Sequence, residues 1–136
     1  MAIQYNLTHR NAVMTQLNSE IGANCALKVW TGSPPVNCAA ADTGTLLLTF
    51  AGNASGFGTV LNGVLTANPI NSAAATNTGT CGYFRIYPTA ATPTNSVLQG
   101  TCSIVGGGGD MQFSNPSVTS GQYIQFTSLS ITAYGA

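Results

Sequence analysis

Five side chains of this 136-residue chain are of types that ligate soft metal ions, four cysteines and one histidine. They are Cys25, Cys38, Cys81, Cys102 and His9. Zinc sites usually take two ligands from a Cys-x-x-Cys pair, and no two of these cysteines are spaced that way. We therefore predict no metal and no cofactor, and we expect the cysteines to fill the core as thiols, with a disulfide still possible after release from the cell.

An Asp-Thr-Gly sequence at Asp42 to Gly44 is the sharpest lead toward an enzyme. In aspartic proteases such a turn supplies one of two carboxylates that share a proton. A bulky apolar strand normally precedes that turn, whereas Ala39 to Ala41 precede it here. We interpret Asp42 as a turn residue that hydrogen-bonds its own backbone ahead of a strand, and we predict that the chain is not an enzyme.

The remaining polar candidates also favour structural roles. The glycine run from Gly106 to Gly109 lacks the Lys-Ser or Lys-Thr of a phosphate loop, so we expect a hairpin turn there. His9 has no carboxylate or thiol near it in the sequence, which favours a surface or interface position. Asp110 and Arg85 could pair across strands and fix their register.

The low charge of the chain restricts its partners. Only 4% of the residues are charged and 44% are hydrophobic. Ordinary soluble proteins carry about 25% charged residues. Three basic residues cannot neutralise many phosphates, so we predict no nucleic-acid partner. Residues 1–20 contain no apolar run, which predicts neither a signal peptide nor a membrane partner. A surface with so few charges also favours association with neighbouring subunits.

One amphipathic helix is predicted over residues 8–21. Asn6 or Thr8 can cap its start, and Gly22 suits the left-handed residue after its end. We expect its apolar face to pack on a sheet or on a neighbouring subunit, and its polar face to lie opposite. The apolar face consists of Val13, Met14, Leu17 and Ile21, and the polar face of Asn11, Thr15, Asn18 and Ser19.

Residues 26–134 read as short strands and turns. Asn62-Gly63 between two apolar pairs is typical of a two-residue hairpin. The alternation in Tyr123 to Tyr134 changes phase near Thr127 and Ser128, which indicates a bulge or a strand that crosses between sheets. We predict one mainly β domain spanning residues 1–136, a β-sandwich or jelly roll with one N-terminal helix.

Three aromatic residues fall on strand faces opposite their apolar neighbours. They are Trp30, Tyr83 and Tyr87. Tryptophan and tyrosine are enriched in protein interfaces, so we add them to the helix residues as a candidate interface. The alternatives are burial against the helix and a carbohydrate-binding platform.

Several stretches in order along the chain resemble a family of small virion proteins of tailed bacteriophages, among them jelly-roll cement proteins that decorate capsids. The matching stretches are Arg10-Asn11-Ala12, Ile21-Gly22, Leu27 to Gly32, Cys38 to Thr45, Gly79 to Tyr87, Gln99-Gly100-Thr101, Gly106 to Met111 and Gly121 to Thr132.

The resemblance implies a non-enzymatic cement or decoration protein that binds and stabilises the phage head. Its partner would be the major capsid protein, and it would form a homo-oligomer, with a dimer favoured over a trimer. It would be made in the host bacterial cytoplasm and end on the capsid surface. The alternatives are a tail, baseplate or fibre component and a carbohydrate-binding module.

Overall fold

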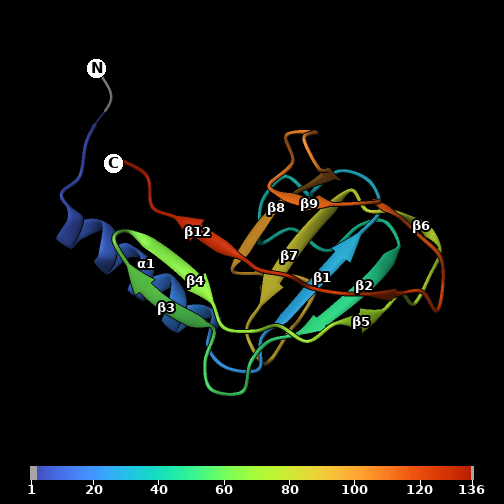
Figure 1. The fold of residues 1–136 in the computed structure, drawn as a ribbon, viewed down its shortest axis with the longest axis horizontal. Helices are drawn as coiled ribbons and strands as arrows, with labels where there is room; N and C mark the ends of the chain where they lie inside the picture. The colour runs from blue at the N-terminus through green and yellow to red at the C-terminus, as the bar shows by residue number, and fades with distance from the viewer. Residues whose placement is uncertain (1–2, 136) are drawn as a thin grey trace.

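A five-stranded sheet forms the centre of the structure, a computed structural model that describes residues 3–135 (Figure 1). All neighbouring strands are antiparallel except β8 and β9, which are parallel. The prediction of a hairpin turn at Gly106 to Gly109 is therefore wrong, because the turn leads into a parallel neighbour. In spatial order the strands are β2 (Leu46–Ala51), β1 (Ala26–Trp30), β7 (Tyr83–Tyr87), β8 (Leu98–Ile104) and β9 (Met111–Phe113).

The helix and a three-stranded sheet form one end of the molecule, and the first and last described residues lie close to it (Figure 1). The predicted Asn62-Gly63 hairpin is confirmed, with φ of 53° and 75° at its two residues. Both values lie in the region that a two-residue turn with a right-handed strand twist requires. The elements are α1 (Leu7–Ile21), β3 (Gly58–Leu61), β4 (Val64–Ala67) and β12 (Ser130–Thr132).

Two pairs of very short strands complete the fold. They are β6 (Gly79–Thr80) with β10 (Ser117–Val118), and β5 (Ala73–Ala74) with β11 (Tyr123–Ile124). The C-terminal segment first pairs with β5 and then, after residues 125–129, pairs with β4 through β12. The phase change near Thr127 and Ser128 therefore marks a crossing between two sheets, one of the two interpretations of the pattern.

The ends of α1 follow local sequence signals. The Asn6 side chain accepts a hydrogen bond of 2.8 Å from the backbone N–H of His9. Gly22 has a φ of 70°, and its N–H donates to the carbonyl of Asn18 at 3.0 Å. The helix begins one residue before the predicted start and ends at the predicted residue.

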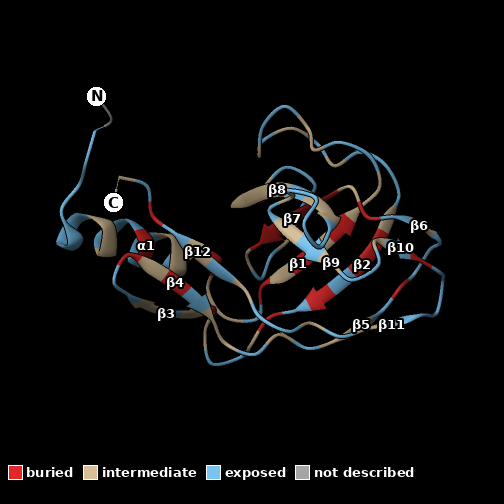
Figure 2. Ribbon diagram, turned by 45° about the horizontal axis from the view of Figure 1, so that its top comes forward, coloured by how far each residue is buried: buried red, intermediate tan, exposed pale blue. Residues whose placement is uncertain are grey.

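The centre of the large sheet is the most buried part of the structure, and Figure 2 shows buried residues in β1, β2 and β7. Leu27 and Val29 stand opposite Ile86 and Phe84 on one face, which is part of the main apolar core. Strand β7 is buried at all five positions, so its second face is covered as well. That second face carries Arg85 and is closed by loops.

The prediction of a mainly β chain with one helix is confirmed, with 34% strand and 11% helix. The finer prediction of a jelly-roll sandwich is not confirmed. The strands form one five-stranded sheet, one three-stranded sheet and two two-stranded sheets.

Candidate functional site

Arg85 lies at the centre of the second sheet face and is 0% exposed. Every nitrogen of its guanidinium donates a hydrogen bond of between 2.7 and 3.2 Å. These bonds tie two loops, residues 31–45 and 88–97, to the sheet. The acceptors are the carboxylate of Asp42, the side-chain oxygen of Gln99 and the backbone carbonyls of Asn37, Ala40 and Pro93.

Asp42 neutralises this buried cation. Its Oδ1 lies 2.7 Å from Nη1 of Arg85 and also accepts a hydrogen bond from the hydroxyl of Tyr87. Burial lowers the pKa of Arg85, but the hydrogen bonds from its guanidinium to Asp42 and the contact with Tyr87 outweigh this, and the net pKa is raised. Burial, and then the hydrogen bond to Asp42, raise the pKa of Tyr87. The cluster therefore holds an ion pair between Arg85 and Asp42 and a phenol that stays protonated at neutral pH.

This geometry corrects two expectations about Asp42 and Asp110. Asp42 binds Arg85 and Tyr87 rather than its own backbone, so the carboxylate is engaged in holding a loop. Asp110 does not pair with Arg85, because it accepts hydrogen bonds from the backbone N–H and the hydroxyl of Thr101 at 2.9 and 3.0 Å.

Two of the three aromatic residues of the candidate interface, Tyr83 and Tyr87, lie beneath the loop of residues 31–45. Tyr83 and Tyr87 are 0% and 1% exposed, and the Tyr83 hydroxyl donates to the carbonyl of Thr43 at 2.6 Å. The ring of Trp30 stacks on that of Tyr83, with 6.3 Å between the ring centroids. The prediction that Tyr83 and Tyr87 form an exposed interface or platform is therefore wrong, because residues 31–45 cover them. Trp30 is half-buried.

The helix contacts the β3–β4 hairpin through its asparagines. Asn18 donates to the carbonyl of Gly58 and accepts from its N–H, both at 3.0 Å. Asn11 accepts a 2.7 Å hydrogen bond from the N–H of Gly63. The prediction that these asparagines lie opposite the packed face is therefore wrong. They share that face with Met14 and Ile21, which are 6% and 1% exposed.

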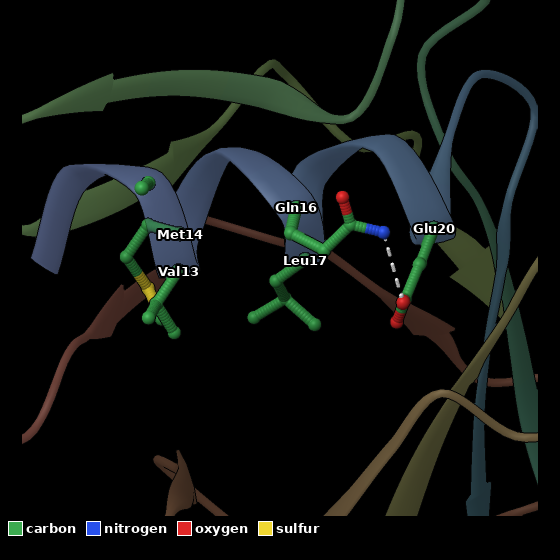
Figure 3. Close-up of a pocket in the computed structure, with 6 residues that line it drawn as sticks. Val13, Met14, Gln16, Leu17 and Glu20 are labelled. Atoms are coloured by element: carbon green, nitrogen blue, oxygen red, sulfur yellow. Dashed lines mark hydrogen bonds between the residues drawn. The ribbon is translucent and has the colours of Figure 1, made fainter. Parts of the chain in front are cut away.

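Only part of the predicted apolar helix face is accessible. Val13 is 44% exposed and Leu17 is half-buried, whereas Met14 and Ile21 belong to the core. Val13, Leu17 and Glu20 border a shallow hollow on the helix (Figure 3). A hydrogen bond of 3.2 Å from Gln16 to Glu20 crosses its rim.

Further exposed apolar side chains gather around this end of the molecule. The backbone N–H of Tyr5 donates to the carbonyl of Gly135 at 2.8 Å, which joins the two terminal segments beside the helix. The tip of the β3–β4 hairpin reaches the same end (Figure 1). We define the helix-end surface as Ile3, Tyr5, Leu7, Val13, Leu61 and Tyr134, which are 42% to 93% exposed.

Sequence reasoning found Val13 but not the other five members of the helix-end surface. Leu61 was identifiable, because it precedes the Asn62-Gly63 turn and therefore lies at a hairpin tip. The terminal residues carry no such signal, since their position depends on the hydrogen bond between Tyr5 and Gly135.

The cysteines are free thiols, and two of them are in the core. Cys25 and Cys81 are buried, whereas Cys38 and Cys102 are half-buried. Burial raises the pKa of Cys81 to about 11. Burial, and then the proximity of Cys81 and Asp110, raise the pKa of Cys102 to about 12. The thiols of Cys81 and Cys102 therefore remain protonated at neutral pH, and a protonated thiol is a poor nucleophile and a poor metal ligand.

Within residues 3–135, no three or more His, Cys, Asp or Glu side chains cluster in a way that could hold a metal ion. The same part of the chain contains no helix with the length and apolar character needed to cross a membrane.

No protein-family model matches the sequence, and neither a curated protein nor a solved structure matches the chain.

Proposed function

We propose that this chain is a non-enzymatic structural protein of a tailed-phage virion, a cement or decoration protein that binds and stabilises the head. The observation that carries the proposal is the helix-end surface, six exposed apolar side chains at one end of a protein with 4% charged residues. Large exposed apolar residues that gather in one region usually mark a contact with another protein.

The chemistry of the chain suits repeated contacts with a shell. Its partner on the head is the major capsid protein, and many copies engage one particle, so that avidity compensates for a modest affinity at each contact. The protein forms a homo-oligomer, with a dimer favoured over a trimer. It is made in the host bacterial cytoplasm and ends on the capsid surface.

The proposed role does not need a catalytic centre. The carboxylate that suggested one, Asp42, is held by Arg85 and Tyr87. The resemblance implies a jelly roll for the cement proteins, and we propose that the central sheet with its covering segments is an irregular relative of that sandwich.

The proposal is tested with heads assembled in the absence of this chain. The purified protein should co-sediment with these heads, and Leu61→Ser and Tyr134→Ser should each weaken binding by roughly tenfold if they are central contacts. Val36→Ser is the matched control, because Val36 is 90% exposed but lies in the loop that covers Arg85, outside the helix-end surface.

Failure of the wild-type protein to co-sediment with heads would overturn the proposal. Binding that is unchanged in both variants would instead show that another surface contacts the shell. Thermal unfolding of each variant checks that the fold is retained, which we expect because the side chains of Leu61 and Tyr134 are 72% and 93% exposed.

A further inference from the structure

A groove runs between β9 and the C-terminal segment 122–130, away from the helix-end surface. Its volume is about 690 Å³. Sites for small molecules usually measure about 300–1,000 Å³. The walls combine side-chain amides and hydroxyls with aromatic rings, and residues that line it include Asp110, Asn115, Gln122, Tyr123, Gln125 and Ser128.

The polar groups of this groove have unused hydrogen-bonding capacity. Gln125 and Ser128 are exposed, and neither side chain takes part in a hydrogen bond among residues 3–135. Asn115 and Gln122 use only their side-chain oxygens, which accept from the N–H groups of Ser117 and Thr119 at 3.0 and 2.9 Å. Their NH₂ groups therefore remain available to donate.

An aromatic residue stands beside these amides. Tyr123 is 71% exposed, although it belongs to the short strand β11. The neighbouring Phe126 packs edge-on against Phe50 at 5.1 Å, which anchors the segment to the core and fixes the position of the groove wall. An exposed ring on an anchored segment provides an apolar face that a ligand can cover without reordering the protein.

The charges of the groove define the chemical class of its ligand. Asp110 is the one ionisable acid in its lining, and the lining contains no lysine, arginine or histidine. An anionic ligand such as a phosphate would therefore find no counter-charge. A neutral ligand that carries many hydroxyl groups would match the amides and hydroxyls, and its C–H faces would suit the ring of Tyr123.

An extended peptide fits the groove less well. Peptides that add to a sheet need a regular edge, usually about 5–6 residues long. Strand β9 has only three residues, and the opposite wall at residues 125–129 is outside any strand.

We propose that the groove between β9 and residues 122–130 binds a neutral oligosaccharide, with Tyr123 as the stacking ring and Gln125, Asn115 and Gln122 as hydrogen-bonding groups. This inference goes beyond the proposed function and does not depend on it, because the groove and the helix-end surface share no residue.

The test begins with an array of neutral oligosaccharides containing glucose, galactose, mannose and N-acetylhexosamines, with sialylated and sulfated glycans beside them. The best neutral glycan is then titrated calorimetrically into the wild-type protein, Tyr123→Ala and Gln125→Ala. Each variant should bind roughly tenfold more weakly, since it loses a stacking face or a set of hydrogen bonds. Tyr134→Ala is the matched control, an exposed tyrosine outside the groove that should leave affinity unchanged.

Gln125→Ala keeps the test decisive if Tyr123→Ala fails to fold, because Gln125 is exposed and its side chain makes no hydrogen bond to the described residues. The inference is overturned if no neutral glycan binds, if only anionic glycans bind, or if both groove variants retain wild-type affinity. A screen of a peptide library would also overturn the inference if it yields peptides whose binding depends on Tyr123 while no glycan binds. The groove would then be a peptide site.

Discussion

Arg85 determines how the second face of the central sheet is closed. A buried cation is costly unless it has a counter-ion and satisfied N–H groups, and Arg85 has both. Apart from Gln99 on β8, its partners come from two loops that lack regular structure and contain few large apolar residues. The guanidinium therefore takes the place of a hydrophobic contact in holding the loops over Tyr83 and Tyr87.

Asp42→Asn should strongly destabilise the protein, because it leaves the buried cation without its counter-charge. We expect the free energy of unfolding to fall by about 3–5 kcal/mol. Denaturant unfolding measures this change. Asp110→Asn is the control, since Asp110 is exposed and its loss should cost less than about 1 kcal/mol. Equal effects of the two substitutions would contradict the structural role of Asp42.

The buried thiols predict a loss of stability at alkaline pH. Burial raises the pKa of Cys81 from 9.0 to about 11, and burial with nearby charges raises that of Cys102 to about 12. The unfolded chain therefore releases these protons at lower pH than the folded one. The contribution of the protonated thiols to the free energy of unfolding is fully present below about pH 9, and it is lost as the pH rises through the pKa values of the folded state. Unfolding measured across this range should show a shallower decline in Cys81→Ala. An unchanged slope would contradict the assignment.

Sequence alone identified some of these residue roles but not their partners. The burial of Cys25 and Cys81 follows from the ordinary behaviour of cysteine. The pairing of Arg85 with Asp42 joins residues 43 positions apart through a loop without periodicity. Since no local pattern records such a contact, the cross-strand partner Asp110 was the nearest acid that sequence reasoning could offer.

At the scale of elements, the helix packs through hydrogen bonds as well as apolar contacts. Asn18 satisfies both backbone groups of Gly58, at a point where a Cβ on residue 58 would collide with the backbone of Thr66. The glycine lets the strands approach closely, and the asparagine then pairs the polar groups that face the helix.

Asn18→Ala should therefore cost about 1–3 kcal/mol, because it leaves a part-buried N–H and carbonyl of Gly58 without partners. Thermal or denaturant unfolding tests this. Ser19→Ala changes the next residue, which is exposed, and should have little effect. A similar loss from both substitutions would mean that general helix propensity, rather than this contact, sets the stability.

Element boundaries were predictable where the signal is local. The Asn6 cap, the Gly22 terminus and the Asn62-Gly63 turn are set by residues within one turn of the chain. The helix face was not predictable, because asparagine counts as polar in any periodicity analysis, yet it can be buried against a backbone it satisfies. The covered second face of β7 was missed for a similar reason, because Arg85 counts as charged although it is buried with all its hydrogen bonds satisfied.

At the scale of the whole molecule, the scarcity of charge predicts how binding responds to salt. Only six residues carry a charge at neutral pH, and one oppositely charged pair of them is the ion pair of Arg85 with Asp42. Contacts made by apolar side chains are little screened by ions. We therefore expect the affinity for heads to change by less than about threefold between low and physiological salt. Co-sedimentation at several salt concentrations measures this, and a steep loss would indicate an electrostatic interface instead.

The most direct test of the central proposal is the copy number of this chain in purified particles of the phage that we propose as its source. Gel densitometry against the major capsid protein gives the ratio of the two chains. A near-stoichiometric ratio, hundreds of copies per particle, is the result that a head cement protein predicts. A handful of copies would assign the chain to the tail or baseplate, and its complete absence from the particle would contradict the virion role.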